Sequence, residues 1–348
     1  SATPPTEALW IYTTGGLIGA SLAELLAPHG RLVTRWQAWR NRTFQATRDA
    51  DLAIAALAAW AMGQLTPFVP SFDLGGLRHG LAPLAATLQD PATFDFALMA
   101  VAALEIFALV LLARDARIRS VSLNRTLWTF AFAVLALKVA IISRQLSAEA
   151  LAGTAAGLLS GLGFPRRLKP WRPALATLAL TLALVAGELT PEAGALRHMN
   201  WMPFVAHMNN PMVGVSVLID SVWPYLVLSA AMCRLSRHNR TSAMVIIALC
   251  GALSFGLESL QQYIPGRTPD ITTVTVAVLT VFLVVRHAGF FATTPAPASS
   301  GPAHGPRLAG TMFAAAVLCT ITALWSLART PPPTQLASSR TKVMLPPP

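Results

Sequence analysis

Apolar segments long enough to cross a lipid bilayer follow one another along most of this chain, and charged residues lie mainly in the short stretches between them. A helix rises about 1.5 Å per residue, so about 20 apolar residues cross the roughly 30 Å hydrocarbon core. These segments are apolar on every side instead of alternating, which favours helices over the strands of a barrel. We therefore predict an all-α fold, a polytopic transmembrane bundle of about ten spans.

Composition agrees with this fold class. Only 12% of residues are charged, 54% are hydrophobic and the mean hydropathy is +0.55, which leaves too little charge to cover the surface of a soluble domain. We expect the spans near residues 8–26, 52–69, 94–113, 127–142, 148–164, 175–189, 212–232, 242–260, 271–285 and 309–327. The lipid bilayer is thus the first expected partner.

Basic residues alternate between two sets of predicted loops. One set is rich in arginine, whereas the loops of the other set hold only Arg78, Arg144, Arg197 and Arg267. Because basic short loops stay on the cytoplasmic side, we predict that the arginine-rich loops are cytoplasmic and that both termini face outward. The net charge of +11 is therefore explained by topology, and no nucleic-acid partner is predicted. Basic residues after position 327 do not fit this alternation.

An internal repeat is indicated by two similar sequences at the ends of two spans. Gly63-Gln-Leu-Thr-Pro67 and Gly187-Glu-Leu-Thr-Pro191 differ at one position. We predict a unit of about four helices that occurs twice and follows a fragment of a third copy. The predicted units are 1–27, the last helix of a truncated first repeat, 51–164, a degenerate middle repeat, and 174–286, a fuller repeat. They are followed by an extra transmembrane helix at 309–327 and a flexible, proline-rich tail at 328–348.

The densest polar cluster runs from Glu258 to Asp270. Glu258 and Gln261 share a helix face because they are three residues apart. Pro265 and Gly266 then end the helix, and Arg267 and Asp270 follow. A carboxylate within a span is costly, so Glu258 indicates a functional site by default. The alternative is a structural Glu258–Arg267 ion pair that holds the turn.

Other ionisable residues also fall within spans. Glu105, Lys138 and Asp220 could form a proton or ion path, or could pair simply to permit insertion. Glu105 would then neutralise Lys138, and Asp220 would pair with Arg267 or accept hydrogen bonds near Trp223. His198 and His207 have no convincing third ligand, so we predict no metal site and no cofactor.

The pattern Glu258-x-x-Gln261, then Pro265-Gly266-Arg267, then Asp270 before a small-residue helix resembles the VanZ-like membrane protein family. The upstream Asn200-Trp-Met-Pro203-Phe204 is similar to that family's Asn-x-x-Pro-Phe element. The resemblance covers roughly 174–285, and it implies a bacterial envelope protein of the cytoplasmic membrane, from a family named for a role in resistance to glycopeptides such as teicoplanin. The matched positions, which we take as the candidate ligand-binding residues, are Asn200, Pro203, Phe204, Glu258, Gln261, Arg267 and Asp270.

The middle repeat departs from this pattern. It keeps Arg144, but Leu135 stands where the glutamate is expected, Lys138 where the glutamine is, and Ser147 where the acidic residue is. The leading hypothesis is an envelope protein, without an assigned catalytic residue, that binds a lipid-linked or surface glycan or another envelope protein. The alternatives are a secondary transporter that uses Asp220 and Glu258, and a membrane enzyme of glycan assembly with Glu258 as general base.

Overall fold

The computed structural model describes residues 31–71, 73–116, 123–204, 211–236 and 238–291. Across these ranges the chain is all-α, as predicted. The helices are α2 (Arg31–Thr43), α3 (Arg48–Leu65), α4 (Leu74–Gln89), α5 (Phe96–Ala116), α6 (Leu123–Lys138), α7 (Ala148–Gly163), α8 (Arg172–Glu188), α10 (Pro211–Leu235), α11 (Arg240–Gln261) and α12 (Ile271–His287), with short 3-10 helices η1 (Pro91–Thr93) and η2 (Arg166–Trp171). The predicted segments 1–27, 309–327 and 328–348 lie outside the described residues.

Four helical segments in the described part of the chain are long and apolar enough to cross a membrane. They are Phe96–Ala116, Arg166–Glu188, Ser216–Leu235 and Arg240–Gln261, and α12 is apolar but shorter. Each coincides with a predicted span. The other predicted spans among the described residues form α3, α6 and α7, which do not reach that length or apolarity.

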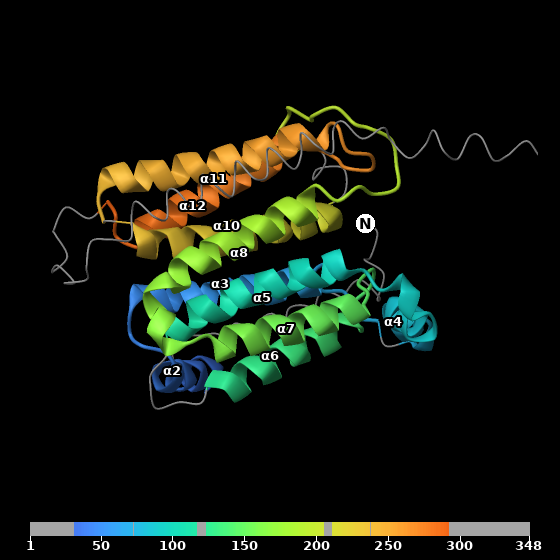
Figure 1. The fold of residues 1–348 in the computed structure, drawn as a ribbon, viewed down its shortest axis with the longest axis horizontal. Coiled ribbons are helices and arrows are strands. Elements are labelled where there is room, and N and C mark those ends of the chain that lie inside the picture. The colour runs from blue at the N-terminus through green and yellow to red at the C-terminus, as the bar shows by residue number, and fades with distance from the viewer. Residues whose placement is uncertain (1–30, 72, 117–122, 205–210, 237, 292–348) are drawn as a thin grey trace, which may run out of the picture.

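The long helices run side by side, with α3, α5, α8 and α10 in the middle of the bundle (Figure 1). Within the first half, α5 packs against α3 and α7; within the second, α10 packs against α8 and α12. Between the halves, α3 packs against α10 and α5 packs against α8. Exchanging the two halves therefore maps these six helix contacts onto one another, although the α10–α11 contact has no comparable α5–α6 counterpart.

The α5–α7 contact is close because α7 presents glycines at every fourth position. A methyl group at Gly153 would lie 2.5 Å from the Met99 carbonyl oxygen, and one at Gly157 would lie 2.5 Å from that of Ala103. Small residues at this spacing let two backbones approach each other in a membrane, where packing replaces the hydrophobic driving force. On α5 itself, every residue from 108 to 113 is buried, as expected for a central helix that is apolar all round.

Arginine-rich segments gather at one end of the bundle, where α5, α10 and α12 end and α3, α8 and α11 begin (Figure 1). Arg172 pairs there with Asp115 at 2.7 Å, and Arg234 contacts Asp49 at 3.6 Å. The opposite end, where α4 lies, is called the α4 end below. The separation of basic loops that the sequence predicts is thus present in the fold.

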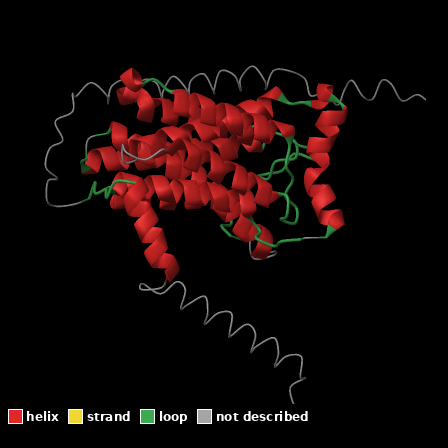
Figure 2. Cartoon of the chain, turned by 90° about the horizontal axis from the view of Figure 1, so that it is seen from below, coloured by secondary structure: helices red, strands yellow, loops and turns green. Residues whose placement is uncertain are grey.

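Two local predictions were wrong. The predicted span 127–142 ends at Lys138, because 139–142 leave the helix and pair with the segment after α3: Ser71 N donates to Ala140 O at 2.7 Å and Ile142 N to Val69 O at 2.9 Å. The stretch 74–89, which falls in the predicted loop between the spans 52–69 and 94–113, is the helix α4. It lies across the end of the bundle (Figure 2).

Candidate functional site

Four predicted site residues meet at the start of α12, at the α4 end. The buried Glu258 side chain accepts a hydrogen bond through Oε2 from the Asp270 backbone N at 2.7 Å. Asp270 caps α12 by accepting from Thr272 N at 2.8 Å, and Phe204 N donates to the Thr272 hydroxyl at 2.8 Å. Asn200 N donates to Pro269 O at 2.9 Å, and Ile271 N donates to Asn200 O at 3.0 Å. These contacts hold the 200–204 loop against the turn before α12.

Gln261 and Arg267 instead reach the end of α8. Gln261 Nε2 donates to Glu188 Oε2 at 2.7 Å. Arg267 donates from Nε to Thr190 O at 2.9 Å and also to Gly187 O, and it pairs with Glu192 at 3.0 Å. The guanidinium therefore satisfies the carbonyl groups that α8 leaves free at its C-terminus, where a positive charge is favoured.

The seven predicted residues thus lie in one region but form two groups, and all except Pro203 make hydrogen bonds within the chain that the structure describes. Pro203 lies exposed in the same loop as Asn200. The proposed Glu258–Arg267 ion pair is wrong, since Arg267 pairs with Glu192 and Glu258 accepts from the backbone. The physical reason is that Arg267 follows the turn at Pro265 and Gly266, which directs it back toward α8.

Equivalent contacts occur in the first half. Arg144 Nε donates to Thr66 O at 2.5 Å, as Arg267 does to Thr190 O. Lys138 Nζ donates to Gln64 Oε1 at 2.9 Å, as Gln261 donates to Glu188 in the second half. Ser147 caps α7 through a bond from Ala150 N at 3.1 Å, as Asp270 caps α12. Lys138 and Ser147 therefore keep the contacts of Gln261 and Asp270, whereas Leu135 cannot accept a hydrogen bond as Glu258 does.

Charged side chains from both halves lie close together between the helices. Arg144 Nη2 donates to Asp220 Oδ2 of α10 at 3.1 Å, and a methyl group at Gly63 of α3 would lie 3.0 Å from Asp220 Oδ1. Lys138 interacts electrostatically with Glu105, Arg144 and Asp220, and Glu188 with Asp220. We call Glu105, Lys138, Arg144, Glu188 and Asp220 the central charged cluster.

The pairing of Asp220 with Arg267, one of the two predicted possibilities, is wrong, because Asp220 pairs with Arg144 of the other half. Glu188 was not among the predicted site residues. A signal was present in the sequence. The pentapeptides 63–67 and 187–191 differ only at their second residue, which is Gln64 in the first and Glu188 in the second. The partners of these two residues also differ: Gln64 contacts Lys138, and Glu188 contacts Gln261.

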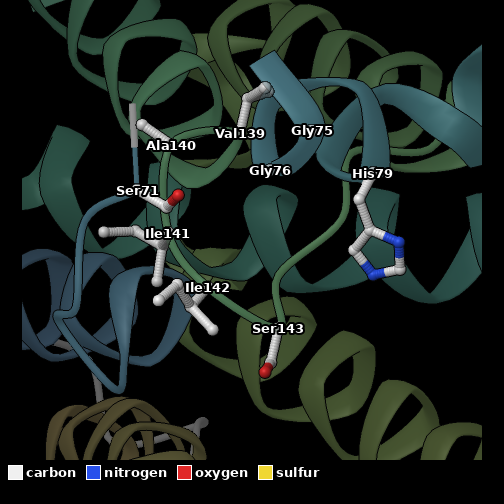
Figure 3. Close-up of a pocket in the computed structure, with 9 residues that line it drawn as sticks. All are labelled: Ser71, Gly75, Gly76, His79, Val139, Ala140, Ile141, Ile142 and Ser143. Carbon is white, nitrogen blue, oxygen red and sulfur yellow. The ribbon is translucent and has the colours of Figure 1, made fainter. Parts of the chain in front are cut away.

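A pocket of about 240 Å³ lies at the α4 end, away from the seven predicted residues. It is lined by Ser71, Gly75, Gly76, His79 and residues 139–143, with α4 on one side and the segment after α6 on the other (Figure 3). Next to it, hydrogen bonds from the Ser71 hydroxyl and the Gly76 backbone lower the pKa of Asp73, which caps α4. Within the described ranges, no group of three or more His, Cys, Asp or Glu side chains could hold a metal ion.

Comparison of the chain with protein-family models, with curated proteins and with solved structures finds no match.

Proposed function

We propose that this chain is a polytopic protein of the bacterial cytoplasmic membrane, built from two four-helix repeats, and that it works as a secondary transporter. The repeats are α3, α5, α6 and α7, followed by α8, α10, α11 and α12. The observation that carries the proposal is the central charged cluster, in which Arg144 of one repeat pairs with Asp220 of the other at 3.1 Å. Ionisable groups among membrane helices mark solute or proton pathways, and transporters commonly bind at the interface of two repeats.

Two features support the repeats. The contacts of α3, α5 and α7 with one another and with the other half match those of α8, α10 and α12 when the halves are exchanged. Arg144 and Arg267 donate to equivalent threonine carbonyls, Thr66 and Thr190. Because each repeat contains four helices, both have the same orientation, which is the parallel type of repeat. With the arginine-rich end cytoplasmic, the central charged cluster lies nearer the outer surface.

The proposed coupling depends on the charge of Asp220. Its side chain is 44% exposed and that of Arg144 is 26% exposed, so neither partner is fully enclosed by the helices. Protonation of Asp220 removes its charge and so weakens its ion pair with Arg144. Among the described residues at the α4 end, this is the only ion pair that joins the two repeats. Proton binding would then favour separation of the repeats there, as alternating access requires.

Proton flux tests this function. The purified chain is placed in liposomes that contain the dye pyranine, and amino acids, monocarboxylates, sugar phosphates and organic cations are added in turn under an inward proton gradient. We expect one class to accelerate internal acidification, and Asp220→Asn to abolish that acceleration. Asp90→Asn is the matched control, because Asp90 is an exposed cap and asparagine caps as well as aspartate. Acceleration by none of the classes, or an unchanged rate in Asp220→Asn, would contradict the proposal.

The second candidate is a VanZ-like protein that binds a lipid-linked glycan and contributes to glycopeptide resistance. One observation favours it: exposed aromatic side chains lie in the hydrogen-bonded 200–204 loop and next to Gln262, which accepts from the Met199 backbone N at 3.4 Å. Trp201 is 64% exposed and Tyr263 is 78% exposed. Aromatic side chains with a polar tip suit a boundary between lipid and water.

Binding of radiolabelled lipid-linked glycans to the purified chain tests the second candidate. Arg267 and Glu258 are poor probes because they hold the fold, so we choose Trp201→Ala with Tyr263→Ala. Trp171→Ala, an exposed tryptophan at the arginine-rich end, is the control. We expect loss of binding in the first variant alone, and also loss of rescue when a deletion strain is challenged with teicoplanin. Equal binding by all three proteins would remove this candidate.

A further inference from the structure

α4 carries a continuous row of leucines along one side. Leu74, Leu77, Leu81, Leu84 and Leu88 are spaced by three and four residues, so they share one face of the helix. Leu74 is 86% exposed, Leu81 39% and Leu88 74%. Exposed leucines are ordinary when single, but a row of them requires a partner.

An adjoining side of α4 contacts the protein: Gly80, which is buried, lies three residues from Leu77 and four from Leu84, and both of these leucines are partly buried. A methyl group at Gly80 would lie 2.6 Å from the Val139 carbonyl oxygen, and Gly80 O accepts from Leu146 N at 2.8 Å. His79 and Gln145 are 3.1 Å apart through their side-chain nitrogens. The orientation of α4 is therefore set by the 139–146 segment, and it leaves Leu74, Leu81 and Leu88 exposed beside these contacts.

The charge on α4 favours a phosphate partner. Arg78 is one turn from Leu74 and Leu81 and is exposed. No carboxylate in the described ranges pairs with Arg78. The acidic residues that are nearest along the sequence, Asp73 and Asp90, cap helix ends. An arginine beside an apolar row can bury its stem in lipid and keep its head at the phosphates.

We propose that α4 is an interfacial helix that lies in the lipid monolayer at the α4 end, with its leucine row among the acyl chains and Arg78 at the phosphates. α4 lies across the end of the bundle (Figures 1 and 2), which is the orientation of an interfacial helix relative to spanning helices. A second copy of α4 is a poorer partner, because its 16 residues are shorter than the three to four heptads or so that sustain a coiled coil. This inference does not depend on the proposed transport.

Site-directed spin labelling of the full chain in phosphatidylethanolamine–phosphatidylglycerol nanodiscs tests the inference. Labels are placed by Leu81→Cys and Leu88→Cys in a background without Cys233, Cys250 and Cys319. Ala86→Cys is the matched control, since Ala86 is exposed on the other side of α4. We expect the leucine-row labels to collide with oxygen and to be shielded from nickel chelate, and the Ala86 label to show the reverse. Nickel access on both sides, or broadening between labels of two molecules, would overturn the inference.

A photo-cross-linking amino acid at Leu81 gives a second test that keeps the native cysteines. Met244, which is 60% exposed on the membrane-spanning helix α11, provides the positive control. We expect a lipid adduct at both positions. A dimer band at position 81, or an adduct at 244 without one at 81, would overturn the inference.

Discussion

The Arg144 guanidinium links the two halves of the molecule: its Nη2 donates to Asp220 Oδ2 in α10 at 3.1 Å, and its Nε donates to the Thr66 carbonyl oxygen at 2.5 Å. One side chain thus holds the end of α3 and a helix of the other half. Arg267 occupies the equivalent position, but it pairs with Glu192 of its own half at 3.0 Å. The two halves therefore differ in which partner their arginine selects, and only the first arginine reaches across.

Arg144→Ala is expected to destabilise the protein more than Asp220→Asn. The arginine variant loses the hydrogen bond to Thr66 as well as the ion pair, about 2 kcal/mol in total, whereas the aspartate variant loses about 1 kcal/mol because the pair is partly exposed. Denaturant unfolding in detergent, analysed as a double-mutant cycle, should give a coupling of about 1 kcal/mol. Strictly additive effects would show that the two side chains do not interact.

Gly157→Leu is expected to separate α5 from α7. The new side chain would begin 2.5 Å from the Ala103 carbonyl oxygen and 2.8 Å from Ile106 Cβ, and overpacking of this kind costs about 3 kcal/mol or more. Gly256→Ala is the control, because no atom lies within 4 Å of the added methyl group and alanine is the better helix former by about 1 kcal/mol. A thermal unfolding midpoint that falls equally in both variants would contradict this account.

The pairs Gln64–Lys138 and Glu188–Gln261 should be interchangeable. Glu188→Gln together with Gln261→Lys transfers the first pair into the second half, and we expect the free energy of unfolding to stay within about 1 kcal/mol of the original. Gln261→Leu should cost about 2–3 kcal/mol, because Glu188 would lose a donor in a buried place. A swapped protein that is as unstable as Gln261→Leu would argue against equivalent halves.

Asp270→Ser should be tolerated, because Ser147 has the same capping role at α7. Serine caps a helix about as well as aspartate, whereas Asp270→Ala should cost about 1 kcal/mol. Hydrogen exchange at the first turn of α12 is the local measurement: protection should fall in the alanine variant and remain in the serine variant. Equal loss of protection in both would show that the Asp270 charge, and not its cap, holds the turn.

Much of the fold follows from local sequence. Long, mainly apolar runs such as those of α5 and α11 form helices because neither the lipid nor the protein interior can satisfy free backbone groups. Turn residues such as Pro265 and Gly266 place helix ends to within a few residues. Two similar pentapeptides at 63–67 and 187–191 already indicate equivalent halves, and they lead to the contacts of Thr66 and Thr190.

The partners of the polar side chains were decided by tertiary structure. Asp220 pairs with Arg144 instead of Arg267, and Glu188, which the sequence marks only as the variable position of a repeated pentapeptide, joins the site. Helix formation depends on residues a few positions away in the sequence. An ion pair instead depends on which helices are adjacent and on how far each is shifted along its axis relative to the other. Both are set by helix packing, such as that of Gly153 and Gly157 against α5. α4 illustrates the same limit: its glycines and proline indicate a loop locally, but its backbone forms a helix that rests on the 139–146 segment.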